Sequence, residues 1–131
     1  MTHEEKRLQG EDNFKWGREA EQIAADYFLT HGYSIRERNW KCAHIEIDLI
    51  LELGRTIVFV EVKARNGDNQ DPADAVNSKK KIKMVRGADI YLSHLDHFYY
   101  YRFDIFTITG TREQYTIAHY PDAFLSPVNR R

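Results

Sequence analysis

The segment IEIDLILELGRTIVFVEVKA, residues 45–64, decides the fold of this 131-residue chain. It contains two apolar runs, residues 45–51 and 57–64, that are rich in the β-branched and aromatic residues typical of strands. The runs are joined by LGRT, in which the glycine tolerates the positive φ of a two-residue turn. The segment therefore predicts a β-hairpin in which Leu53 faces Thr56 across the ladder.

Charged side chains face each other across this hairpin. Counting outward from the turn, Asp48 lies opposite Glu61 and Glu46 lies opposite Lys63, and strand alternation points all four side chains to one face. Like charges facing each other destabilise a ladder unless a shared proton or a bound cation offsets the repulsion. Mg²⁺ prefers hard oxygen ligands and needs only one or two carboxylates besides water and phosphate. Asp48 and Glu61 are therefore candidate metal ligands.

A solvated sheet face is the alternative explanation for this pattern, since Glu and Lys two residues apart are common on exposed strands. The neighbours on the predicted face argue against it. Ile57 and Phe59 share the face of Glu61 and Lys63, so the carboxylates adjoin apolar surface. This favours a site over a solvated face, with Lys63 placed to position a water molecule or to stabilise developing negative charge.

Length and composition predict one compact domain over residues 14–125, with tails at residues 1–13 and 126–131. The chain contains no apolar run long enough to span a membrane and no signal-peptide segment, so we expect a cytoplasmic protein with no membrane partner. The single cysteine excludes an internal disulfide. A net charge of -1 means that any binding to nucleic acid requires a local basic patch.

Helical and strand patterns alternate along the chain. Residues 16–30 have the spacing of an amphipathic helix, in which Glu19 lies beside the apolar stripe, one turn before Ile23. Ser78 is the expected cap of a second helix, whose buried stripe is Ile82, Val85, Ala88, Leu92 and Leu95. Strands are expected at residues 33–38, 99–108 and 115–119, and a loop with a short helical turn at residues 66–76. The order predicts the α/β class, a mixed sheet flanked by helices.

The second helix also carries a basic face. Lys79, Lys80, Lys83 and Arg86 lie close together on it, and Arg65 follows the second strand of the hairpin. These residues are candidate contacts to a phosphate backbone, which would give affinity and salt dependence without sequence readout. A basic outward face that serves solubility alone remains an equally good explanation.

The chain resembles the PD-(D/E)XK nuclease superfamily and, within it, the YraN family of small bacterial endonuclease-like proteins. The resemblance extends over residues 16–124. The matching residues are Gly17-Arg18-Glu19, Gly32-Tyr33, Arg38-Asn39-Trp40, Glu46-Ile47-Asp48-Leu49-Ile50, Phe59-Val60-Glu61-Val62-Lys63, Ala75-Val76, Lys80 and Phe103-Asp104. The chain departs from the family at Ile45, where the family has glycine, and at Asn69-Gln70, where it has Phe-Gly.

This resemblance implies a restriction-endonuclease-like fold, similar to that of archaeal Holliday junction resolvases. It also implies a site in which Glu19, Asp48, Glu61 and Lys63 are the catalytic residues. Asp48, Glu61 and Glu19 would hold Mg²⁺ or Mn²⁺, and the substrate would be DNA, including branched or structured forms.

Three hypotheses follow for the function. The first is a metal-dependent endonuclease that acts on DNA, and the second is a nucleic-acid-binding module of the same fold without turnover. The third is a protein-interaction domain that uses the tyrosine-rich strand at residues 99–108. The aromatic residues of that strand are explained by packing within the sheet, by a homodimer surface or by base stacking, and the sequence leaves these open.

Overall fold

The computed structural model describes residues 1–65 and 76–124, with the side chains of residues 12–15 left aside. Its elements are α1 (His3–Thr30), β1 (Ser34–Cys42), β2 (Ile45–Leu53), β3 (Thr56–Arg65), α2 (Ser78–Ser93), β4 (Tyr100–Gly110) and β5 (Tyr115–Phe124). Residues 66–75 of the loop and helical turn expected at residues 66–76 lie outside the described residues, as do the Asn69-Gln70 departure and the tail at residues 126–131.

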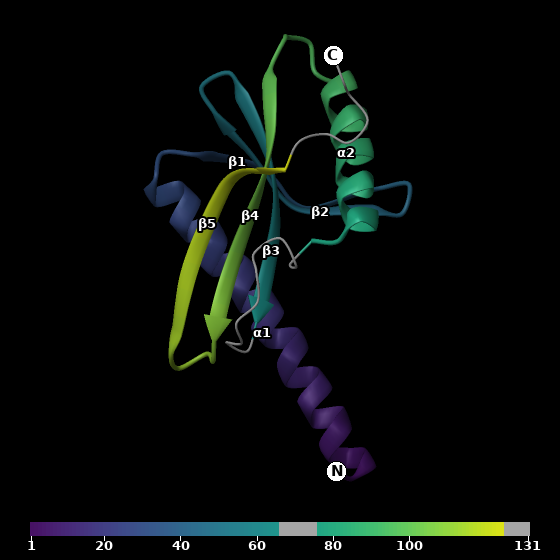
Figure 1. Cartoon of the computed structure of the whole chain (residues 1–131), viewed down its shortest axis with the longest axis vertical. Coiled ribbons are helices and arrows are strands. Elements are labelled where there is room, and N and C mark those ends of the chain that lie inside the picture. The colour runs from purple at the N-terminus through teal and green to yellow at the C-terminus, as the bar shows by residue number, and fades with distance from the viewer. Residues whose placement is uncertain (66–75, 125–131) are drawn as a thin grey trace.

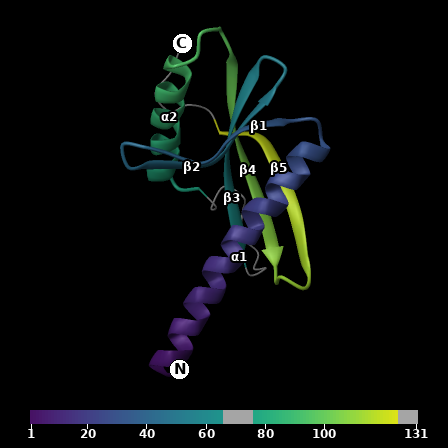
Figure 2. The same ribbon diagram turned by 180° about the vertical axis from the view of Figure 1, so that it is seen from behind.

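The five strands form one open sheet in the order β1-β2-β3-β4-β5. Neighbouring strands are antiparallel except β3 and β4, which are parallel and are connected through α2. The two helices cover opposite faces of the sheet, as the two opposite views show (Figures 1 and 2). The α/β class with a mixed sheet flanked by helices is thus confirmed.

The predicted hairpin is confirmed, and so is its register from the turn to Leu49 and Val60. Leu53 pairs with Thr56, and the ladder continues to Leu49 opposite Val60. Gly54 has a φ of 60°, the left-handed conformation that glycine adopts at little cost. The turn therefore sets which side chains of β2 and β3 meet.

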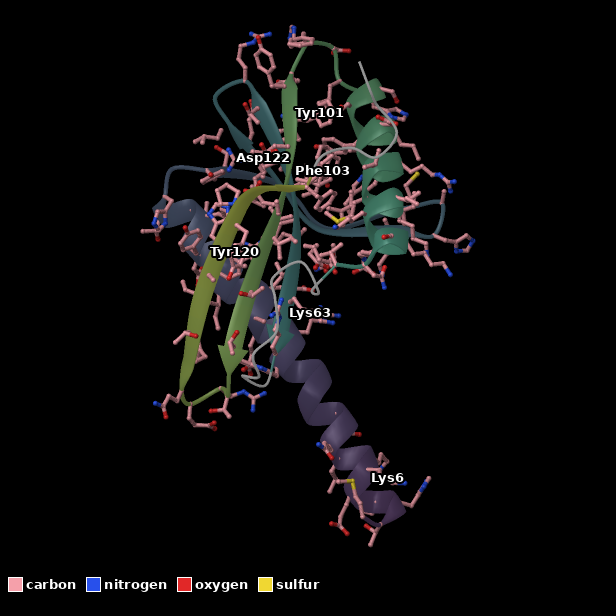
Figure 3. All side chains as sticks on the ribbon, in the orientation of Figure 1. Lys6, Lys63, Tyr101, Phe103, Tyr120 and Asp122 are labelled. Carbon is pink, nitrogen blue, oxygen red and sulfur yellow. The ribbon has the colours of Figure 1, made fainter. Side chains whose placement is uncertain are left out.

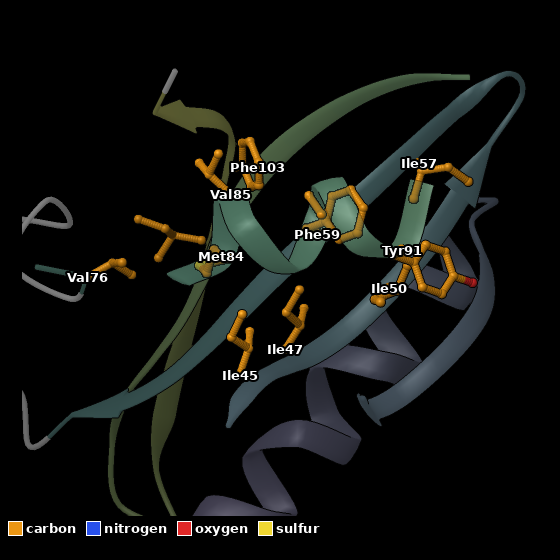
Figure 4. Close-up of a cluster of buried hydrophobic side chains, with 12 residues drawn as sticks. Ile45, Ile47, Ile50, Ile57, Phe59, Val76, Met84, Val85, Tyr91 and Phe103 are labelled. Atoms are coloured by element: carbon orange, nitrogen blue, oxygen red, sulfur yellow. The ribbon is translucent and has the colours of Figure 1, made fainter. Parts of the chain in front are cut away.

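Two apolar cores form, one on each face of the sheet. On the α2 side, Phe59 and Ile50 pack with Met84 and other buried residues of that helix (Figure 4). On the α1 side, Phe28 packs against Leu49 and neighbouring strand residues. Each helix thus contributes its apolar stripe to a different core.

The predicted stripe of α2 is corrected at one end. Val85 and Ala88 are buried as expected, and Leu92 and Leu95 are partly buried against the same core. Ile82 is 42% exposed, whereas Met84 is fully buried. Ile82 and Met84 lie about 200° apart around a helix, so the inward face at the start of α2 contains Met84 and cannot also contain Ile82.

The first helix is longer than predicted. Residues 3–13, expected to be a tail, are the first turns of α1, which extend away from the sheet (Figure 1). Thr2 and Glu5 form a capping box, in which each side chain accepts a hydrogen bond from the backbone N–H of the other residue. Arg7 adds ion pairs to Glu4 and Glu11 at helical spacing. Local polar interactions thus account for this helix without burial.

No helix in the described part of the chain is both long enough and apolar enough to cross a membrane.

Candidate functional site

The site begins where β2 and β3 separate. Their ladder ends at Leu49 and Val60, and the next pair in that register would be Asp48 and Glu61. The carboxylate of Asp48 replaces a backbone partner, since its Oδ2 accepts a hydrogen bond of 2.9 Å from the Val62 N–H. The two acids thus lie together as predicted from the register, but through side chains rather than through a continued ladder.

Asp48 also marks a break in the alternation of β2. Ile47 packs in the core on the α2 side, and Leu49, two residues later, packs in the core on the α1 side. In a regular strand these two side chains would share a face. The expected pairing of Glu46 with Lys63 is therefore wrong, because the ladder ends before it reaches them.

Opposite Asp48 on β1 lies Asn39, between the pairs Arg38–Leu49 and Trp40–Ile47. Asn39 has a φ of 50°, a conformation that asparagine tolerates better than most residues. Burial and the charge of Asp48 raise the pKa of Glu21 on α1, and a hydrogen bond from Asn39 opposes this rise. Asn39 therefore links the irregular part of the sheet to the first helix.

Asp48 and Glu61 are a buried, mutually repelling pair. Burial, followed by the charge of Asp48, raises the pKa of Glu61 to about 8. Burial also raises the pKa of Asp48, against the opposing effects of the Val62 N–H and the charge of Lys80. The side chain of Glu61 is only 14% exposed, and its Oε1 is buried without a hydrogen bond of good geometry. The pair therefore binds a shared proton or another cation more readily than separate carboxylates would.

Lys80 brings a positive charge to this pair from the first turn of α2. Its Nζ lies 3.5 Å from Oε1 of Glu61 and 3.5 Å from the backbone oxygen of Glu46. The N-cap of this helix is Asn77, one residue before the expected cap Ser78, and the Asn77 side chain accepts a 2.9 Å hydrogen bond from the Lys80 N–H. The sequence predicted Lys80 as a contact to phosphate, and the structure places it beside the carboxylates.

The acid that α1 brings to the site is Glu21, which sequence reasoning missed. Burial, followed by the charge of Asp48, raises the pKa of Glu21. Glu19 lies on the other side of the helix, about 200° away around its axis, where it pairs with Arg112 of the turn between β4 and β5. The structure thus does not bring Glu19 to Asp48 and Glu61.

A signal for Glu21 was present in the sequence. Glu21 precedes Ala24, Ala25 and Phe28 by three, four and seven residues, and all three are fully buried. An acid on the apolar stripe of a helix must find a polar environment where the helix meets the sheet. At the same three spacings after Glu19 lie Gln22, Ile23 and Asp26, none of which is fully buried.

A hollow of about 210 Å³ adjoins Asp48 on the α1 side. Its walls include Glu21 and Gln22 of α1, Asn39 of β1, and two arginines, Arg18 and Arg38. Arg38 is oriented by a 2.9 Å hydrogen bond to Gln22. The hollow therefore combines carboxylates with arginines. This combination suits an anionic ligand that contacts both a metal ion on the carboxylates and the arginine side chains.

The remaining predicted residues lie on β3 and α2. Lys63 is exposed on β3 (Figure 3), two residues after Glu61 and hence on the same face. Arg65 is partly buried at the end of the same strand. Lys79, Lys83 and Arg86 are exposed on α2. The structure thus groups Lys80 with the carboxylates and leaves the three other predicted basic residues of α2 at the surface.

A separate polar cluster lies around Asp104 on β4. Asp104 is fully buried and accepts hydrogen bonds from Arg102, from His119 of β5 and from the Asp122 N–H. Burial tends to raise the pKa of Asp104, but the hydrogen bonds from His119 and Arg102 outweigh it and leave the pKa lowered. The carboxylate is fully engaged within the protein, as expected for a structural role.

The donor set at Asp48 and Glu61 fits a magnesium or manganese ion. Both residues offer hard oxygen atoms, and the buried Oε1 of Glu61 is an acceptor without a well-formed hydrogen bond. Among residues 1–65 and 76–124 there is no group of three or more His, Cys, Asp or Glu side chains arranged to hold a metal. The ion would therefore depend on two carboxylates together with water or phosphate, which is a common arrangement for Mg²⁺.

Comparisons with known proteins agree on one family. The model of uncharacterised protein family UPF0102 matches residues 20–108, which include Glu21, Asp48, Glu61 and Lys80. The chain is 37% identical to a UPF0102 protein of Phocaeicola vulgatus over 115 residues, covering 87% of this chain and 95% of that protein. It is 39% identical to UPF0102 proteins of Chlorobium chlorochromatii, covering 82% and 89%, and of Thermodesulfovibrio yellowstonii, covering 82% and 94%.

Proposed function

The chain belongs to the uncharacterised protein family UPF0102, and we propose that it is a metal-dependent nuclease that hydrolyses phosphodiester bonds in DNA. The observation that carries this proposal is the buried pair of Asp48 and Glu61 at the separation of β2 and β3, with Lys80 beside it. The resemblance to PD-(D/E)XK nucleases and to their YraN family supports it, since Asp48, Glu61 and Lys63 match the D and E-x-K positions.

The charges around the pair favour an anionic substrate. Arg18 and Arg38 line the hollow beside Asp48, and Lys80 lies on the other side of the carboxylates. The whole chain has a net charge of only -1, so this positive charge is local. A phosphodiester could be attracted by these cations without general attraction of the protein to polyanions.

In this proposal the residues of the site have two tasks, to hold the metal ion and to orient the attacking water. Asp48 and Glu61 would hold Mg²⁺ or Mn²⁺, which when bound supplies a Lewis acid and lowers the pKa of a water molecule. Glu21 adds negative charge beside Asp48, and it takes the role that the resemblance implied for Glu19. Lys63, on the face of Glu61, orients the attacking water or stabilises the charge that develops on the phosphate.

The exposed basic residues of α2 supply affinity in this proposal. Lys79, Lys83 and Arg86 would contact the phosphate backbone beyond the cleaved bond, together with Arg65 at the end of β3. Such contacts are salt-dependent and do not distinguish sequences. Selectivity would then come from the shape of the DNA, which is why branched and otherwise structured forms belong in the test.

The test is cleavage of single-stranded, duplex and four-way-junction DNA with Mg²⁺ or Mn²⁺. We expect metal-dependent cutting by the wild type and a loss on the order of 10²- to 10³-fold in Asp48→Asn and in Glu61→Gln, the usual effect of removing a group that stabilises transition-state charge. Glu113→Gln is the matched control, because it removes an exposed acid in the turn between β4 and β5.

Two results would overturn the proposal. One is the absence of metal-dependent cutting of every substrate, and the other is cutting by Asp48→Asn and Glu61→Gln at the wild-type rate. Fluorescence anisotropy with the same DNAs adds a distinction: salt-sensitive binding that persists without cutting would support the nucleic-acid-binding module instead.

A further inference from the structure

Lys80 differs from its neighbours on α2 in where its side chain lies. It is 33% exposed and its Nζ is 3.5 Å from Oε1 of Glu61, whereas Lys79 and Lys83 are exposed to solvent. The same Nζ lies 3.5 Å from the backbone oxygen of Glu46 on β2. The ammonium group thus lies between α2 and the strands that carry the acids, where it contacts the atom best suited to hold a metal.

The ammonium group of Lys80 can move while the backbone of Lys80 stays in place. The backbone of Lys80 is anchored at the helix start by the 2.9 Å hydrogen bond from its N–H to Asn77. The side chain beyond it is a flexible stem of four carbons that ends in a compact charge. Its Nζ can therefore leave Glu61 and turn toward solvent without any change in the helix.

A metal ion and the ammonium group compete for the same oxygen. A divalent ion on Oε1 of Glu61 would lie within a few ångströms of the present position of Nζ, and two like charges at that separation repel strongly in a partly buried site. Both carboxylates currently interact with the charge of Lys80. Occupation by a metal therefore requires that Lys80 give up its contact.

We propose that Lys80 is the resident counter-ion of the Asp48–Glu61 pair and competes with the divalent metal for Glu61. This inference rests on the proposed function, because it presumes that the pair binds a metal. While the metal is absent, Lys80 balances the charge of the two acids and thereby weakens metal binding. When a metal enters, the ammonium group of Lys80 leaves Glu61 and becomes available to bind a substrate phosphate beside the site. Lys80 is thus a positioning residue that sets metal affinity, a role distinct from that of the exposed lysines of α2.

The test is Mn²⁺ affinity without DNA, measured by titration calorimetry or by electron paramagnetic resonance of the free ion. Lys80→Met keeps the length of the stem and removes the charge, and Lys79→Met is the matched control, since it makes the same change at the adjacent exposed position. We expect Lys80→Met to bind Mn²⁺ on the order of tenfold more tightly than the wild type. Lys79→Met should stay within about twofold, because exposed charges are screened.

The outcomes separate this inference from the function on which it rests. Equal affinity in Lys80→Met and Lys79→Met, or weaker binding in Lys80→Met, would overturn the counter-ion role and leave the metal site standing. Absence of Mn²⁺ binding in every protein would overturn both. Lys80→Arg keeps the charge and should bind like the wild type, and thermal unfolding of each variant identifies any change that comes from misfolding.

Discussion

Two clusters of buried carboxylates lie in the same sheet and behave in opposite ways. Asp104 is fully buried, with two hydrogen bonds of 2.9 Å from Arg102, one of 2.7 Å with His119 and one of 2.9 Å from the Asp122 N–H. Despite its burial, the pKa of Asp104 is lowered. Asp48 and Glu61 are more exposed to solvent than Asp104, and yet the pKa of each is raised.

The difference lies in the donors, because burial alone would raise the pKa in both clusters. Asp104 receives a guanidinium, an imidazole and a backbone N–H, and these outweigh the cost of burial. Asp48 has one backbone donor, Glu61 has a lysine at 3.5 Å, and each of the two acids repels the other. The first cluster is complete within the protein, whereas the second gains from any further cation.

Replacing one acid of each cluster by asparagine should have its largest effect on the free energy of unfolding. Asp104→Asn removes the charge that faces Arg102 in a buried site, so we expect a loss of about 3–5 kcal/mol in the free energy of unfolding. Asp48→Asn, the matched change in the other cluster, removes a repulsive charge and should lower stability by less than about 1 kcal/mol or raise it. Urea unfolding of both variants at pH 7 measures the difference. A larger loss for Asp48→Asn would show that the two roles are assigned the wrong way round.

The sequence predicted the parts of this picture that depend on local periodicity. The turn after Leu53 sets the register of β2 and β3, so the proximity of Asp48 and Glu61 follows from counting residues. The break in alternation between Ile47 and Leu49 could not be counted, because it occurs where β2 and β3 separate, and the residue pattern of the hairpin does not show where that is.

The features of the site that depend on helix orientation and tertiary contacts could not be predicted from the sequence or were predicted wrongly. Glu19 and Glu21 are two residues apart on α1, and only the face that meets the sheet decides which one reaches Asp48. Lys80 could be recognised as basic, but its contact with Glu61 depends on how α2 packs against β2 and β3. The partners of Asp104 come from two strands joined by a turn whose register, with an irregularity beside Phe103, no local pattern predicts.

A smaller effect should appear in the pH dependence of stability. The pKa of Glu61 is about 8 in the folded protein, against an ordinary value of 4.5, so the folded state keeps a proton that the unfolded state releases. The stability of the wild type should therefore fall as pH rises from about 4.5 to about 8. The side chain in Glu61→Gln cannot ionise, so between pH 4.5 and pH 8.5 the free energy of unfolding of this variant should rise relative to that of the wild type by about 1 kcal/mol or more.

Thermal or urea unfolding across pH 4.5–8.5 measures this divergence, with Glu113→Gln as an exposed control that should follow the wild-type curve. Parallel curves for Glu61→Gln and the wild type would mean that Glu61 keeps an ordinary pKa. In that case the repulsion within the pair would be too weak to favour a cation.

The smallest expected effect distinguishes the two acids of α1. Glu21 acts on Asp48 through its charge, so Glu21→Gln should weaken Mn²⁺ binding by about threefold, as expected for a charge near but outside direct contact. Glu19→Gln removes only a half-exposed ion pair with Arg112, so it should change stability by about 0.2–1 kcal/mol and leave metal affinity unchanged. Calorimetric titration of the two variants side by side makes the comparison, because the variants differ by two positions and carry the same change in charge. A loss of metal affinity in Glu19→Gln that matched or exceeded the loss in Glu21→Gln would mean that α1 presents a different face to β2 when the metal binds.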